Sequence, residues 1–270
     1  MNRNFFIFIF TIILLILILS LKIFNIYSYN NTISSFASYS GFEIDGNKII
    51  KYSNSGGNVV IPSVVNGVTI TEIGDYAFYD LNIDSIIIPK TIISIGDYAF
   101  ANNNISILNL PDSVVSIGEG AFIHNSIKEI KMSSNIDFGN ACFNDNELDM
   151  DNAFFYKNNS NYEELISYGG KIKGNINIPN DNLKIIGEKA FYETYIVSIS
   201  IPNSVIEIKK DAFKSNYLVE LYLSNNINNI DISAFEDNSY LTDIIIDKKI
   251  NTILDYPWGA IYSDLYWLKK

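Results

Sequence analysis

Apolar residues recur at fixed positions along most of this 270-residue chain. In residues 83–100, "IDSIIIPKTIISIGDYAF", seven apolar positions surround one proline, Pro89: Ile83, Ile86, Ile88, Ile92, Ile95, Ala99 and Phe100. The same frame returns at 105–122 and 196–213. The phenylalanine that closes each copy follows Ala or Cys and recurs at spacings of 22, 22, 21, 48, 22 and 22 residues: Phe78, Phe100, Phe122, Phe143, Phe191, Phe213 and Phe235. Columns kept in phase in this way indicate a repeated structural unit.

The repeat predicts a solenoid. A period of about 20–29 residues is too short for one copy to bury its own apolar residues, so neighbouring coils must stack. The segment Leu/Ile-x-x-Ile-x-Ile is typical of a short strand, and the following Pro ends it because Pro has no N–H for the ladder. The rest of each coil predicts an irregular or briefly helical return. The expected fold is therefore mainly β with short helical turns, with a single curved parallel sheet of strands about 4.8 Å apart.

A column of asparagines lies three residues after each phenylalanine: Asn103, Asn125, Asn146, Asn216 and Asn238. Leu81 and Thr194 take this place in the other two coils. Asn tolerates turn geometry and its amide bonds readily to the backbone. We expect the column to be structural, with each amide bonded to the backbone or to its neighbour in the stack.

An interruption of the repeat and its restart divide the chain into segments. Residues 149–172 leave the pattern, and "KGNINIP" at 173–179 then echoes "GGNVVIP" at 56–62. We predict a polar stalk and N-terminal cap at 28–55, a first array at 56–148, an irregular coil at 149–172, a second array at 173–247 and a C-terminal cap at 248–270. The last segment holds Trp258 and Trp267, which are expected to cover the final coil; a ligand pocket around them is the alternative.

A hydrophobic helix is predicted at the N-terminus. Residues 5–21, "FFIFIFTIILLILILSL", carry no charge and lie between Arg3 and Lys22. The stretch is longer than the usual core of a signal peptide, and with the residues up to 27 it approaches the roughly 20 needed to span a bilayer. Residues 1–27 are thus expected to be an uncleaved signal anchor, with a cleaved signal peptide as the alternative. Either way the repeats would be exported, as a membrane-anchored surface protein or a secreted one.

The composition limits which classes of partner are expected. An apolar fraction of 48% is ample for a core. The net charge of −11 excludes nucleic acid as an expected partner, since a polyanion needs a basic face. We expect a monomer.

The sequence lacks the residue patterns typical of catalytic and metal-binding sites. The single histidine, His124, cannot build a His-based metal cluster, and its place in a turn predicts a solvated side chain. The single cysteine, Cys142, falls in the small-residue column with Ala77 and Ala99 and is predicted to be buried. No triad signature or phosphate loop occurs. The chain is therefore expected not to be an enzyme and to have no cofactor and no metal.

The frame "LxxIxIPxxVxxIGxxAFxxN" resembles the BspA-like leucine-rich repeat, also called the Treponema pallidum type. The opening "GGNVVIPSVVNGVTITEIGDYAF" at 56–78 is similar to the usual first coil of that family, and the resemblance covers roughly residues 41–250. It implies a leucine-rich-repeat solenoid on an exported or surface-attached protein. It also implies adhesion to host or matrix proteins or to other cells, and no catalytic residues.

Side chains that alternate with the buried positions of each strand must point outward and form a possible binding face. Tyr222 is the one aromatic among them. The candidate protein-binding residues are Glu129, Lys131, Glu220, Tyr222 and Asp243. The expected function is a protein-binding or adhesion module for an extracellular, host or matrix protein, displayed through a membrane segment at 5–27. The alternative is a structural envelope protein with no specific ligand.

Overall fold

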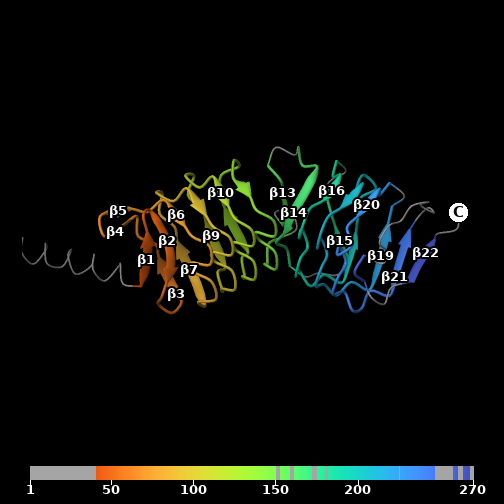
Figure 1. Ribbon diagram of the computed structural model, residues 1–270, viewed down its shortest axis with the longest axis horizontal. Helices are drawn as coiled ribbons and strands as arrows, with labels where there is room; N and C mark the ends of the chain where they lie inside the picture. Colours follow the sequence, from red (N-terminus) through yellow and green to blue (C-terminus); the bar gives the residue numbers. More distant parts are fainter. Residues whose placement is uncertain are drawn as a thin grey trace, which may run out of the picture. The chain divides into compact units, whose positions relative to one another are not determined.

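The computed structural model describes residues 41–149, 153–158, 161–171, 175–179, 182–224, 226–246, 258–260 and 264–267. The chain divides into two units, Met1–Gly41 and Phe42–Lys270, and all described strands belong to the second. Every regular element within the described ranges is a β-strand (Figure 1). The hydrophobic segment predicted at 1–27 lies outside those ranges, as does most of the predicted stalk.

The strands predicted before each proline form and stack in parallel. In the first array, β3 pairs with β7 and β9 pairs with β11; in the second, the order is β15-β17-β19-β21-β22. Their bounds are β3 (Gly57–Val60), β7 (Ile83–Ile87), β9 (Ile107–Asn109), β11 (Glu129–Lys131), β15 (Asn175–Asn177), β17 (Ser198–Ser200), β19 (Glu220–Leu223), β21 (Asp243–Ile246) and β22 (Asp264–Trp267). Ile86 is buried while Ser85 and Ile87 are exposed, so the predicted alternation is confirmed. We call the outward side of these strands the strand face.

The return segments also carry strands, which adds further parallel sheets to the single sheet that the sequence predicted. These return strands have two residues each: β6 (Glu72–Ile73), β8 (Ser94–Ile95), β10 (Ser116–Ile117), β12 (Asp137–Phe138), β16 (Ile185–Ile186), β18 (Glu207–Ile208) and β20 (Asn229–Ile230). Turns follow them where helical turns were expected. The reason is backbone conformation: Tyr98 (φ 53°) and Asn102 (φ 57°) are left-handed, and such residues break a right-handed helix.

The phenylalanine column forms the centre of the core. Phe78, Phe100, Phe122 and Phe143 stack with ring centroids 4.9, 5.2 and 5.6 Å apart. Phe191, Phe213 and Phe235 form a second stack at 5.0 and 5.4 Å. All seven rings are fully buried. Because each ring stacks on rings of the neighbouring coils, the coils depend on one another for burial.

The asparagine column is confirmed as a ladder of side-chain to backbone hydrogen bonds. Asn125 Nδ2 donates to the carbonyl oxygens of Phe100 (2.9 Å) and Phe122 (3.1 Å), and Asn125 Oδ1 accepts from the N–H of Ile105 (3.1 Å). The other four asparagines repeat this pattern: Asn103, Asn146, Asn216 and Asn238. Each amide therefore joins two successive coils.

Both arrays begin with a β-hairpin of the same design. Strands β1 (Phe42–Asp45) and β2 (Lys48–Tyr52) pair antiparallel, and β2 joins β6 in parallel. Within residues 149–172, predicted as an irregular coil, β13 (Phe154–Tyr156) and β14 (Glu164–Tyr168) pair in the same way, and β14 joins β16. Tyr52 stacks on Phe78 at 5.3 Å and Tyr168 packs on Phe191 at 5.4 Å, so each hairpin supplies a tyrosine to cover the first phenylalanine. A smaller hairpin, β4 (Val64–Val65) and β5 (Val68–Thr69), lies in the first coil.

Part of the C-terminal segment continues the stack. Trp258 is buried against Phe235, with ring centroids 6.2 Å apart, and its carbonyl oxygen accepts from the Phe235 N–H at 2.9 Å. Strand β22 pairs in parallel with β21. Trp258 therefore takes the place that a phenylalanine holds in the preceding coils.

A cluster of ion pairs joins the two arrays. His124 Nδ1 lies 2.8 Å from Asp145 Oδ2, and its Nε2 lies 2.8 Å from Glu193 Oε2 in the second array. Lys189 of the second array contacts Glu119 of the first at 2.5 Å. The prediction that His124 is a solvated turn residue is wrong, because its left-handed turn (φ 56°) carries the ring between two carboxylates. Burial alone would lower the pKa of His124, but both carboxylates outweigh it and raise the pKa to about 9.

Phe100→Ala should lower the free energy of unfolding by about 3–5 kcal/mol, as is typical for a buried Phe whose cavity cannot collapse. Position in the sequence alone would predict a smaller loss for Phe235→Ala, near the end of the array. Because Trp258 covers Phe235, we expect a loss in the same range there. Urea denaturation of the two variants measures both, and a loss at Phe235 under half that at Phe100 would contradict the coverage by Trp258.

The His124 cluster predicts a loss of stability at alkaline pH. A folded-state pKa of about 9 lies above the usual value of 6.5, so the stabilisation is complete below pH 6.5 and is lost as the pH rises through 9. Thermal melts of the protein at pH 6 and pH 9.5 should show this fall, and His124→Gln should flatten it. His124 is the only histidine in the chain. If the stability of His124→Gln fell with pH as the wild type's does, the alkaline loss could not be assigned to His124.

Candidate functional site

The structure places the five candidate residues on the strand face but in two separate groups. Glu129 and Lys131 lie on β11 of the first array, and both are exposed. Glu220 and Tyr222 are exposed on β19, with Asp243 half-buried on β21. Glu220 is the register partner of Asp243, so their carboxylates belong to neighbouring positions of adjacent strands. The second group is therefore a compact set, while Glu129 and Lys131 lie elsewhere.

Tyr222 projects from the strand face with 53% of its surface exposed. Its register partners are Ser200 on β17 and Ile245 on β21. The hydrogen bond with Glu220 raises the pKa of the Tyr222 hydroxyl, and the carboxylate of Asp243 adds to the effect. A shallow depression of about 610 Å³ lies beside it, lined by residues of β17 and β19, Ser200 among them, and by Val197 and Val219, which precede these strands. This corner of the second array combines one aromatic ring with an acidic edge.

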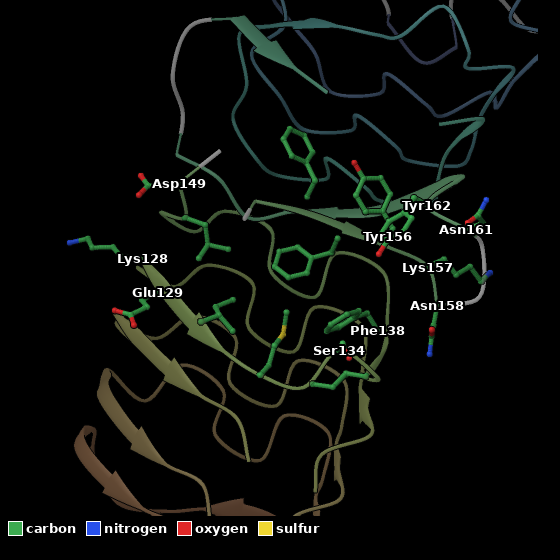
Figure 2. Close-up of a pocket in the computed structure, with 16 residues that line it drawn as sticks. Lys128, Glu129, Ser134, Phe138, Asp149, Tyr156, Lys157, Asn158, Asn161 and Tyr162 are labelled. Atoms are coloured by element: carbon green, nitrogen blue, oxygen red, sulfur yellow. The ribbon is translucent and has the colours of Figure 1, made fainter. Parts of the chain in front are cut away.

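A larger cleft of about 930 Å³ lies between the last coil of the first array and the second hairpin. Figure 2 shows Lys128, Glu129 and Asp149 on one side of the cleft and Tyr156 and Tyr162 on the other. The two tyrosine rings meet edge to face at 5.5 Å. The sequence pattern did not indicate this cleft, because it depends on a hairpin within residues predicted to be irregular. Among the sequence candidates, the cleft includes only Glu129.

An exposed apolar group also lies on the strand face of the first array. Val60, Ile87 and Ile107 are 59%, 62% and 52% exposed on the strand face. Val60 and Ile87 are register partners on β3 and β7. Ile87 and Ile107 alternate with the buried residues Ile86 and Leu108, so the alternation along a strand accounts for their outward direction.

Three further features of the described residues concern metal binding, the single thiol and membrane-spanning helices. Within the described ranges, no group of three or more His, Cys, Asp or Glu side chains is arranged to hold a metal ion. Cys142 is fully buried in the alanine column, as predicted, and burial raises the pKa of its thiol. Among the residues described, no helix has the length and apolar content to cross a membrane.

A solved structure shares the stacked-coil fold. A leucine-rich repeat protein from Eubacterium ventriosum aligns with a TM-score of 0.56 at 19% identity, over 82% of this chain and 72% of that one. Two others align less well. The pneumococcal vaccine antigen PcpA has a TM-score of 0.41 at 18% identity, over 84% of this chain and 85% of that one. A leucine rich cell surface protein from Faecalibacterium prausnitzii has a TM-score of 0.38 at 17% identity, over 85% and 93%. At 19% identity the likeness to the Eubacterium ventriosum protein shows the fold alone.

A search of curated protein sequences finds no significant match. A family model described as "BspA type Leucine rich repeat region (6 copies)" matches residues 57–165 and 167–259, which is most of the chain. These segments contain both phenylalanine stacks and the asparagine ladder. The chain therefore belongs to the BspA-type leucine-rich repeat family.

Proposed function

We propose that this is a non-enzymatic, exported leucine-rich repeat protein that binds a protein ligand on the strand face of its second array. The observation that carries the proposal is the exposed ring of Tyr222 beside two carboxylates, Glu220 and Asp243, on adjacent strands. Tyr offers a wide contact area and a polar tip at low entropic cost, which suits it to anchor an interface. The ring contributes little to the core, because Leu221 and Leu223 hold the buried positions of β19.

The charge beside Tyr222 favours a basic partner. Glu220 and Asp243 are register partners, and the chain as a whole carries a net charge of −11. A cationic partner would relieve the repulsion between these like charges. Long-range attraction would also speed association and make it sensitive to salt.

Export is supported by the uncharged stretch at residues 5–21, which together with the residues up to 27 approaches the length needed to span a bilayer. The proposal is that residues 5–27 remain attached as an anchor and display the repeats on the outside of the cell. A cleaved signal peptide would give a secreted protein with the same binding face.

Tyr222→Ala should weaken binding about 5- to 30-fold, the range expected for loss of roughly 1–2 kcal/mol at a modest hot spot. Binding of the purified protein to a panel of immobilised extracellular-matrix proteins measures this. Tyr76→Ala is the matched control, because Tyr76 is 56% exposed beside the return strands and stacks only on the surface. Tyr98 is less suitable, since its hydroxyl bonds to Glu119 at 2.8 Å. Loss of binding in Tyr76→Ala but not in Tyr222→Ala would place the ligand on the return side.

Protease treatment of intact cells tests export and anchoring together. We expect the repeats to be removed while an N-terminal peptide stays in the membrane fraction, where mass spectrometry should detect it. A mature N-terminus between residues 28 and 40 would overturn the anchor and leave a secreted protein. Full protection of the repeats in intact cells would overturn export.

A further inference from the structure

Three tyrosines of the second array form a ladder across successive coils. Tyr195, Tyr217 and Tyr240 have ring centroids 5.6 and 5.9 Å apart. Tyr217 is 48% exposed and Tyr240 is 59% exposed, while Tyr195 is half-buried. Each directly precedes the buried residue that opens its coil: Ile196, Leu218 and Leu241. We call these three residues the tyrosine ladder.

The repeat itself does not require aromatic residues at this place. In the first array the residues that precede Ile83, Ile105 and Ile127 are Asn82, Asn104 and Ser126. The same contrast holds two positions further along, where the first array has Asp84, Ser106 and Lys128 and the second has Val197, Val219 and Thr242. Since the coils fold alike in both arrays, the tyrosine ladder adds surface chemistry that the stacking of coils does not need.

The tyrosine ladder is continuous with the surface around Tyr222. The Tyr217 N–H donates to the Ile196 carbonyl oxygen at 3.0 Å, and the Val219 N–H donates to the Val197 carbonyl oxygen at 3.2 Å, so consecutive coils are held side by side here. Val197 and Val219, 42% and 47% exposed, separate the ladder from Glu220 on β19. The combined surface runs from the tyrosines through the two valines to the carboxylates and Tyr222.

The charges on this surface are acidic. Glu220 and Asp243 form no ion pair with any cation in the described part of the chain. At the other end of the ladder, Asp145 and Glu193 lie close enough to raise the pKa of Tyr195 after burial, but both are occupied by His124. Exposed aromatic rings and carboxylates that form no ion pair in the described residues thus share one surface, with Val197 and Val219 between the ladder and Glu220. A guanidinium group suits such a surface, since Arg stacks on an aromatic face and pairs with carboxylate at its edge.

We propose that the tyrosine ladder binds arginine side chains of an extended, basic protein segment that crosses the coils. The proposal rests on the proposed function and names the chemistry of its ligand. Alternate side chains of an extended segment are about 6.6 Å apart, within about 1 Å of the ring spacing, so successive arginines can reach successive rings. Lysine is expected to bind less well, because its ammonium group is a compact point charge that cannot stack flat.

The test uses three fluorescein-labelled decapeptides with alternating Arg–Ser, Lys–Ser or Glu–Ser sequence. Their binding to the full-length protein in uncharged detergent is followed by fluorescence anisotropy. Tyr217→Ala should weaken binding of the Arg–Ser peptide about 5- to 10-fold, and Tyr217→Phe, which keeps the ring, should change it less than twofold. Ser126→Ala, at the same place in the first array, is the matched control and should bind as wild type does. Thermal melts confirm that each variant is folded.

Four results would overturn the inference. They are wild-type affinity in Tyr217→Ala, equal affinity for the Arg–Ser and Lys–Ser peptides, no binding of any peptide, or displacement of the Arg–Ser peptide by a neutral oligosaccharide, which would indicate a glycan site. The proposed function and the tyrosine ladder can be tested separately. If Tyr222→Ala loses matrix-protein binding while Tyr217→Ala keeps it, the ligand binds on the strand face and the tyrosine ladder does not take part in binding.

Discussion

The structure depends on the fact that no coil can bury its own apolar residues. A coil of about 22 residues places one phenylalanine ring in the stack, and the rings of the neighbouring coils cover it. The asparagine ladder adds a polar constraint to this apolar one, because each amide satisfies backbone groups of two successive coils. Burial and hydrogen bonding therefore fix the same stacking, and every coil is stable only as part of an array.

Such an array must be closed at its ends, and the chain solves this problem in related ways. Tyr52 and Tyr168, each at the end of a hairpin, cover the first phenylalanine of their arrays. Trp258 does the same for Phe235. The second hairpin also packs back onto the first array, where Phe155 lies 4.4 Å from Phe143. One hairpin thus ends one stack and begins the next, and the ion pairs of His124 and Lys189 connect the arrays beside it.

The outward columns are free of these constraints, and the two arrays use them differently. The first array has polar residues such as Asn104 and Ser126 at the opening of its coils and an apolar group on the strand face. The second array has the tyrosine ladder at the opening and Tyr222 with two carboxylates on the face. Because the buried residues follow the same frame in both arrays, the two arrays differ in their surface chemistry. The surface residues are the ones that would select a ligand.

The sequence by itself determined the repeat, the stacking and the identity of the core, because burial acts on local columns that a fixed period makes visible. Phe100, Asn125 and Cys142 could all be assigned from their spacing alone. It also showed that Glu220, Tyr222 and Asp243 point outward, since alternation along a strand is a local property. Only the tertiary structure decided the hairpin at Phe154–Tyr168, whose strands follow no repeat, and hence the cleft beside it. Only the tertiary structure brought His124 to Glu193, 69 residues away, because that contact depends on how one array follows the other and on no pattern within either.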